Sequence, residues 1–209
     1  MTFILLAILV VLLIWVLMKL FNRSAAERPA APAGPDLANL KVTDARAGDA
    51  ISISGLGENF ADLDFTADRY TRFDAGAHPW IELSGAYRDR RVALRVAGDE
   101  ELELAVHADS RKLELEDLGL AEEDLATMDE RQNTSDSFEF DGGVWLYRRS
   151  REVKAWRDGQ SQAAAFYDWD FQEQGGKRLL AIRKVEGEPF AVMLYTGIPE
   201  GDVTVYRSR

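Results

Sequence analysis

The feature that most constrains this chain is an apolar run at residues 2–20, which no charge interrupts before Lys19. As an α-helix, the run would be about 28 Å long, close to the thickness of the hydrocarbon core of a bilayer. It has no polar face, which argues against a helix on a globular core. No Lys or Arg precedes it and no Ala-x-Ala site follows it, so a cleaved signal peptide is the less favoured alternative. We therefore predict that residues 1–23 are a transmembrane anchor with a basic flank.

The basic residues next to the run predict its orientation. Lys19, Arg23 and Arg28 all follow the apolar stretch, where they would contact anionic lipid headgroups. Positive charges stay on the cytoplasmic side, and the absence of cysteine agrees with a reducing compartment. We expect a single-pass protein of a bacterial inner membrane, with its soluble domain in the cytoplasm.

Composition divides the rest of the chain into two parts. Residues 24–40 are rich in Ala and Pro and predict an extended tether, and residues 41–209 carry a strand-like pattern. The formal charge is −11, and no cluster of Lys and Arg lies beyond the membrane flank, which argues against a nucleic-acid partner. The charge favours basic proteins, metal ions or organic cations as partners. Alternatively, it only keeps the surface soluble.

Alternation of apolar and polar residues predicts antiparallel strands through most of residues 41–209. One helix interrupts them at residues 121–131, where Leu125 and Met128 share a stripe and three acids occupy the first turn. A hairpin is expected around Asp141-Gly142-Gly143. The strands are expected at residues 49–54, 62–66, 91–96, 101–107, 112–116, 137–140, 144–148, 153–156, 164–171, 178–185, 189–196 and 203–206.

A faint repeat relates the two sides of the helix. Trp80 precedes Ala93-Leu94-Arg95, and Trp169 precedes Ala181-Ile182-Arg183. Two related meanders would explain this, as would chance similarity between hairpins of like composition. The predicted fold is mainly β, an antiparallel domain of two meanders or partly open barrels. Its possible halves are residues 47–117 and 137–207, with the short helix between them.

The aromatic strand at residues 166–171 carries the most distinctive local pattern. Period two places Asp168 and Asp170 on the face opposite Tyr167 and Trp169. Two carboxylates about 7 Å apart could bind a cation or perform acid–base hydrolysis. No His or Arg follows at a fixed spacing, so we favour an aromatic core face beneath a solvated acidic face. Arg95 and His107 are likewise predicted to face solvent.

The remaining inventory excludes several chemistries. The chain has no cysteine and two histidines, which argues against structural zinc and thiol catalysis, and His78 is predicted to lie in a turn. We predict no catalytic residue, metal or cofactor. Trp145, Trp156 and Trp169 could line a ligand cavity of a barrel, although tryptophans are more often part of the core.

The chain carries a recognisable set of motifs, most of them in its second half. These are Gly48-Asp49 at the first strand, the segment LGLAEE at residues 118–123, the hairpin FEFDGGVWLY at residues 138–147, and residues 166–198. With them, the chain resembles the domain-of-unknown-function family 4178 over roughly residues 47–206. The resemblance implies a β-rich bacterial domain with no assigned activity, linked to membrane stress or polyamine systems.

We therefore expect a membrane-anchored, non-catalytic binding or scaffold module that meets a protein partner. The first alternative is a barrel that binds a small ligand or cation through Trp145, Trp156, Trp169, Asp168 and Asp170. The second, less favoured, is a hydrolase that depends on the two aspartates.

Overall fold

The structure is a computed structural model, and it describes residues 40–98 and 101–207. The predicted anchor lies outside these residues, together with Lys19, Arg23, Arg28 and all of the predicted tether except Leu40. Within the described part, no helix is both long enough and apolar enough to cross a membrane.

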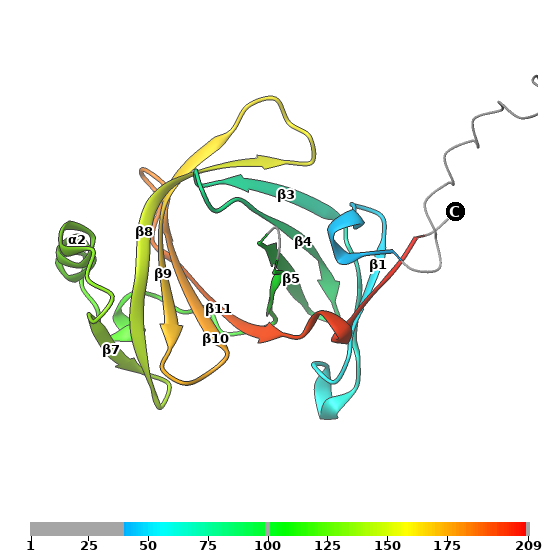
Figure 1. Ribbon diagram of the computed structural model, residues 1–209, viewed down its shortest axis with the longest axis horizontal. Helices are drawn as coiled ribbons and strands as arrows, with labels where there is room; N and C mark the ends of the chain where they lie inside the picture. The colour runs from blue at the N-terminus through cyan, green and yellow to red at the C-terminus, as the bar shows by residue number, and fades with distance from the viewer. Residues whose placement is uncertain (1–39, 99–100, 208–209) are drawn as a thin grey trace, which may run out of the picture. The chain divides into compact units, whose positions relative to one another are not determined.

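Eight antiparallel strands close into a barrel (Figure 1). Their order is β3-β4-β5-β6-β11-β10-β9-β8, and β8 pairs with β3 to complete the ring. The mainly β prediction is confirmed, and both expected halves contribute strands to this one barrel. The bounds are β3 Arg69–Asp74, β4 Trp80–Tyr87, β5 Arg90–Ala97, β6 Glu103–His107, β8 Gly143–Arg157, β9 Ala164–Glu173, β10 Arg178–Lys184 and β11 Ala191–Ile198.

A second, smaller sheet covers the outer face of one side of the barrel. It has the order β12-β1-β2, with β1 at Ala50–Ile53, β2 at Leu63–Thr66 and β12 at Val203–Tyr206. Ile51, Ile53 and Leu63 are buried in one cluster with Leu83 and Leu94 of the barrel. The strands expected at residues 49–54 and 62–66 are therefore confirmed, each with one buried face.

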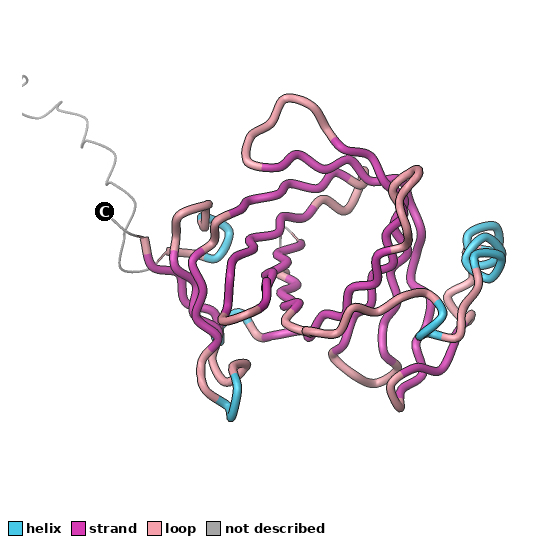
Figure 2. The backbone as a smooth tube through the Cα atoms, turned by 180° about the vertical axis from the view of Figure 1, so that it is seen from behind, coloured by secondary structure: helices cyan, strands magenta, loops and turns pink. Residues whose placement is uncertain are grey.

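Helix α2, at Glu122–Arg131, covers the outer face of the other side (Figure 2). Its start is fixed by Asp124, whose Oδ2 accepts a hydrogen bond of 2.8 Å from the backbone N–H of Ala121. Leu125 is buried against Trp169 and Leu180, on the outer faces of β9 and β10. The predicted helix is confirmed, and strand β7, Ser137–Phe140, pairs with β8 beside it as the expected hairpin.

Some predicted elements differ from the structure. Residues 112–116 were expected to form a strand, but only Leu113 bridges to Val192, and a short 3₁₀ helix follows at Glu116–Leu118. The leucines of this segment still pack on the outside of the barrel, but they lie in a turn and not in a hydrogen-bonded strand. Residues 153–156 continue strand β8 instead of forming a strand of their own. The pattern also missed β3 and β4. The remaining 3₁₀ turns lie at Val42–Asp44, Glu58–Phe60 and Glu200–Asp202.

The barrel buries side chains on both of its faces. Outward-facing apolar side chains such as Leu94, Phe171 and Leu180 are covered by the small sheet or by the α2 region. Because side chains alternate along a strand, their polar neighbours point into the barrel. Charged residues at these inward positions, such as Arg95 and Asp170, therefore gather in its interior.

Candidate functional site

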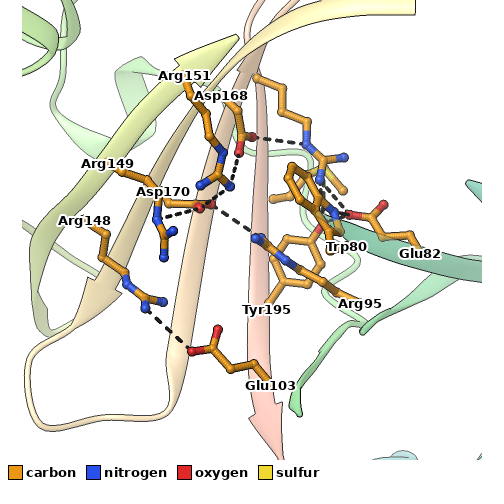
Figure 3. A network of polar contacts seen from close by, with 12 residues as sticks. Trp80, Glu82, Arg95, Glu103, Arg148, Arg149, Arg151, Asp168, Asp170 and Tyr195 are labelled. Atoms are coloured by element: carbon orange, nitrogen blue, oxygen red, sulfur yellow. Dashed lines mark hydrogen bonds and ion pairs between the residues drawn. The ribbon is translucent and has the colours of Figure 1, made fainter. Parts of the chain in front are cut away.

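Charged and aromatic side chains fill the middle of the barrel (Figure 3). They come from β4, β5, β8, β9, β10 and β11, and every one lies at an inward-facing register position. We call this group the central ion network. It consists of Trp80, Glu82, Arg95, Arg149, Arg151, Asp168, Asp170, Arg183 and Tyr195.

Glu82 accepts more hydrogen bonds than the other carboxylates of the network. Its Oε1 accepts hydrogen bonds from Arg183 Nη2 at 2.6 Å, from Tyr195 OH at 3.0 Å and from Trp80 Nε1 at 3.3 Å. Burial disfavours the charged carboxylate, but the Arg183 guanidinium outweighs this and lowers the pKa of Glu82. Glu82 is therefore ionised and tied to Arg183.

Asp168 and Asp170 lie inside the barrel, so the prediction that they form a solvated acidic face is wrong. Their side chains are 0% and 9% exposed. Asp170 Oδ2 accepts a hydrogen bond of 2.8 Å from Arg151 Nη2, and Asp168 Oδ1 accepts one of 3.4 Å from Arg183 Nε. Period two placed the two aspartates on one face correctly. However, the opposite aromatic face is also buried, beneath α2.

The network moves the pKa values of the two aspartates in opposite directions. Burial, and then the charge of Asp170, raise the pKa of Asp168 to about 6. Burial acts on Asp170 too, but the Arg95 and Arg151 guanidiniums outweigh it and hold the pKa of Asp170 below its usual value. Oδ2 of Asp168 has no hydrogen-bond partner among the described residues.

Arg95 is also buried, so its predicted position facing solvent is wrong. Its guanidinium lies 4.6 Å from the ring centroid of Trp80 and forms an ion pair of 3.4 Å with Asp170. An arginine points inward here because the apolar neighbours Leu94 and Val96 occupy the outer face, where the small sheet covers them. Arg183 occupies the same kind of position on β10 and lies over Phe73 and Phe166.

A cavity of about 1620 Å³ opens at one end of the barrel, on one side of this network. We call it the mouth cavity. Glu82 and Arg183 of the network line it, together with Phe73 and Phe166. It extends outward past the 110–122 segment and the β10–β11 connection. Four of the inward residues that line it are small, namely Ala93, Ala155, Ala164 and Ala191.

Arginines line one arc of this cavity. Arg69 of β3 and Arg157 of β8 lie on paired strands, where Thr71 is the register partner of Arg157. Neither Arg69 nor Arg157 has an acidic partner within 4.0 Å in the part of the chain that the structure describes. Arg91, on the same arc, is instead neutralised by a bidentate pair with Asp68 at 2.6 and 2.9 Å.

The predicted site residues are not brought together as expected. Trp145 and Trp169 are buried on the outside of the barrel, where their indole N–H groups donate to the carbonyls of Phe140 and Leu125. Trp156 stacks against the Arg72 guanidinium at 4.6 Å. None of these three tryptophans, and neither Asp168 nor Asp170, lines the mouth cavity.

The two histidines lie at opposite ends of the barrel. His107 was predicted to face solvent, but it is half-buried, lines the mouth cavity, and its Nδ1 lies 2.9 Å from the carbonyl oxygen of Leu194. His78 lies in the β3–β4 loop, as expected. Among the described residues, no three or more His, Asp or Glu side chains are grouped as metal ligands would be.

Sequence reasoning missed the arginines of the barrel interior. The signal was present in the repeated Ala-x-Arg of Ala93-Leu94-Arg95 and Ala181-Ile182-Arg183, since both arginines prove to be inward-facing neighbours of an inward alanine. Trp80 and Trp169 do not continue the repeat, because the first points into the barrel and the second out of it.

Comparisons of the chain with models of known protein families, with curated proteins and with solved structures give no match. The resemblance to the domain-of-unknown-function family 4178 therefore stays a prediction.

Proposed function

We propose that this chain binds a small acidic molecule with an apolar part, which it holds in the mouth cavity of its barrel. The observation that carries the proposal is the position of Arg69 and Arg157, which line the cavity with no acidic partner among the described residues. Arg69 is half-buried and Arg157 is exposed at the rim of the cavity. A guanidinium gains most from a bidentate carboxylate, which matches its planar donors.

The sign of the charge separates this proposal from the cation-binding alternative. The whole chain carries a formal charge of −11, yet this arc of the cavity is basic. The buried acid at the cavity floor, Glu82, is already neutralised by Arg183 at 2.6 Å. A cationic ligand would meet Arg69 and Arg157 without a free carboxylate deep in the cavity to offset them.

The walls of the cavity support an apolar part in the ligand. Ala93, Ala155 and Ala164 leave space near the opening, and Phe166 and Met193 add apolar surface beside them. Ligand sites in proteins commonly combine such walls with a few polar groups that fix the orientation of the ligand.

Matched probes with one alkyl chain and different head groups test the proposal. Hexanoate and hexylamine are titrated calorimetrically into the full-length protein in detergent. Hexanoate should bind and hexylamine should not. In the double variant Arg69→Gln/Arg157→Gln, the affinity for hexanoate should fall about tenfold or more, since each charge-assisted hydrogen bond contributes about 1.5–3 kcal/mol.

Two further variants control the experiment. Arg72→Gln also removes a cation, but one that stacks on Trp156 away from the cavity, so it should leave the affinity unchanged. Ala155→Phe should block the cavity and abolish binding while all charges remain. If hexylamine binds as well as hexanoate, or if Arg72→Gln weakens binding as much as the double variant, the proposal is wrong.

The scaffold function and its protein partner stay predictions, which the described residues do not test. No observation favours the hydrolase alternative, because a molecule in the mouth cavity would not contact Asp168 or Asp170.

A further inference from the structure

The far end of the barrel has its own cluster of arginines, separate from the mouth cavity. Strand β8 carries a β-bulge between Tyr147 and Arg149, which changes its register with β9. Tyr147 pairs with Phe171 on the outer face, and Arg149 pairs with Asp170 on the inner face. Arg148 is the extra residue of the bulge.

The bulge places two consecutive arginines at one hollow. In a regular strand, Arg148 and Arg149 would point to opposite faces, whereas a bulge can aim adjacent side chains to the same side. Both line a hollow of about 560 Å³ together with Gln172 and His78. Figure 3 shows the two side chains leaving β8 toward the same side, with Arg148 directed to Glu103 and Arg149 to Asp170.

Neither guanidinium is fully used by the protein. The ion pairs Arg148–Glu103 and Arg149–Asp170 are both 3.8 Å long, beyond hydrogen-bond distance. Asp170 is already engaged by Arg151 at 2.8 Å. The side chains of Arg148 and Arg149 are 30% and 27% exposed, so a ligand can reach both from the solvent.

Positive charge is in excess around this hollow. Three guanidiniums, those of Arg95, Arg149 and Arg151, pair with the single carboxylate of Asp170, and Arg148 pairs with Glu103. Arg151 has two further donors, Nε and Nη1, that are buried without a partner among the described residues. Burial, and then the charge of Arg151, lower the pKa of Arg149, as expected where cations outnumber their partners.

We propose that Arg148 and Arg149 form a second binding site, one for a small oxyanion such as inorganic phosphate, at the end of the barrel opposite the mouth cavity. The ligand accepts hydrogen bonds from both guanidiniums and offsets their charge. This site rests on the bulge and does not depend on the proposed function of the mouth cavity.

Inorganic phosphate is the probe that tests the site. It is titrated into the full-length protein at constant ionic strength, and binding is followed by calorimetry. Wild-type protein should bind phosphate, and Arg148→Gln/Arg149→Gln should lower the affinity about tenfold or more. Arg148→Gln alone, at the more exposed of the two positions, should lower it measurably without disturbing the network.

Variants at the other end of the barrel separate this site from the mouth cavity. Arg69→Gln/Arg157→Gln should keep the phosphate affinity of the wild type, and Arg148→Gln should keep its affinity for hexanoate. The inference is overturned if wild-type protein binds no phosphate, or if Arg72→Gln reduces the affinity as much as the double variant at the bulge.

Discussion

At the scale of single residues, Asp168 and Asp170 show how strongly position inside the barrel controls charge. They lie two residues apart on one strand, yet the pKa of Asp168 is raised to about 6, by burial and by Asp170, while that of Asp170 is lowered. The difference comes from the neighbouring charges, since the Arg95 and Arg151 guanidiniums outweigh burial at Asp170, whereas the charge of Asp170 adds to burial at Asp168. Asp170 therefore stabilises the fold when it is ionised, and Asp168 when it is protonated.

The opposite shifts of the two pKa values predict how the stability of the protein depends on pH. Because the pKa of Asp168 is raised in the folded state, its stabilisation is complete below about pH 4 and is lost as the pH rises through about 6. Asp168→Asn cannot ionise, so the variant does not lose stability in this way as the pH rises. The free energy of unfolding of the variant relative to wild type should therefore increase by up to about 3 kcal/mol between pH 4 and pH 7. Urea denaturation of the full-length protein at several pH values measures it.

Asp170→Asn is the matched variant, and its effect on stability should depend on pH in the opposite direction. The lowered pKa of Asp170 contributes stability above the pKa of the unfolded chain, and this is lost as the pH falls through the folded value. The variant should therefore be most destabilised at neutral pH and least destabilised in acid. If the two variants follow the same pH dependence, the assignment of opposite shifts is wrong.

At the scale of elements, alternation in the sequence predicted strands well but not which face points inward. The expected strands at residues 49–54, 62–66 and 91–96 form, and their apolar residues Ile51, Leu63 and Leu94 are buried. Arg95 was misplaced because alternation assigns one face to the core and one to water, whereas both faces of β5 are buried here. The polar inner face needs strands from both halves of the chain, so no local pattern could indicate it.

Helix α2 was predicted well because its signals are local. Its stripe of Leu125 and Met128 and its acidic first turn lie within a few residues of each other. What the stripe contacts was not predictable, since Trp169 and Leu180 come from strands about 40 to 60 residues further along the chain. The mouth cavity escaped prediction for the same reason, because Arg69 and Arg157 meet only when β3 pairs with β8.

The docking of α2 leads to a stability prediction. Leu125 is 1% exposed and lies on the outer face of the barrel with Trp169. Leu125→Ala should therefore lower the free energy of unfolding by about 2–4 kcal/mol through lost burial and a cavity. Thr127→Ala, on the exposed side of the same helix, should change it by less than about 0.5 kcal/mol. Equal effects of the two substitutions would contradict this packing. Thermal unfolding followed by circular dichroism distinguishes the outcomes.

At the scale of the whole molecule, the barrel and the small sheet must approach closely to bury their shared core. Strands β1, β2 and β12 come from both ends of the described chain and meet only in the folded state. Their apolar residues pack on β4 and β5 across Gly85, a buried glycine in β4. A side chain at Gly85 would meet the backbone oxygen of Thr66 and lie 2.9 Å from Phe65 Cδ2. The glycine therefore sets how closely the two sheets pack.

Gly85→Ala tests this contact with a single methyl group. Because the carbonyl of Thr66 belongs to the backbone of β2, it cannot move without displacing the small sheet, and overpacking of this kind costs about 1–3 kcal/mol. Gly201→Ala is the matched control, since a methyl group there would meet nothing within 4 Å. Urea denaturation should show a clear loss for Gly85→Ala and almost none for Gly201→Ala. Equal stability of the two variants would mean that the small sheet does not hold its position on the barrel through this contact.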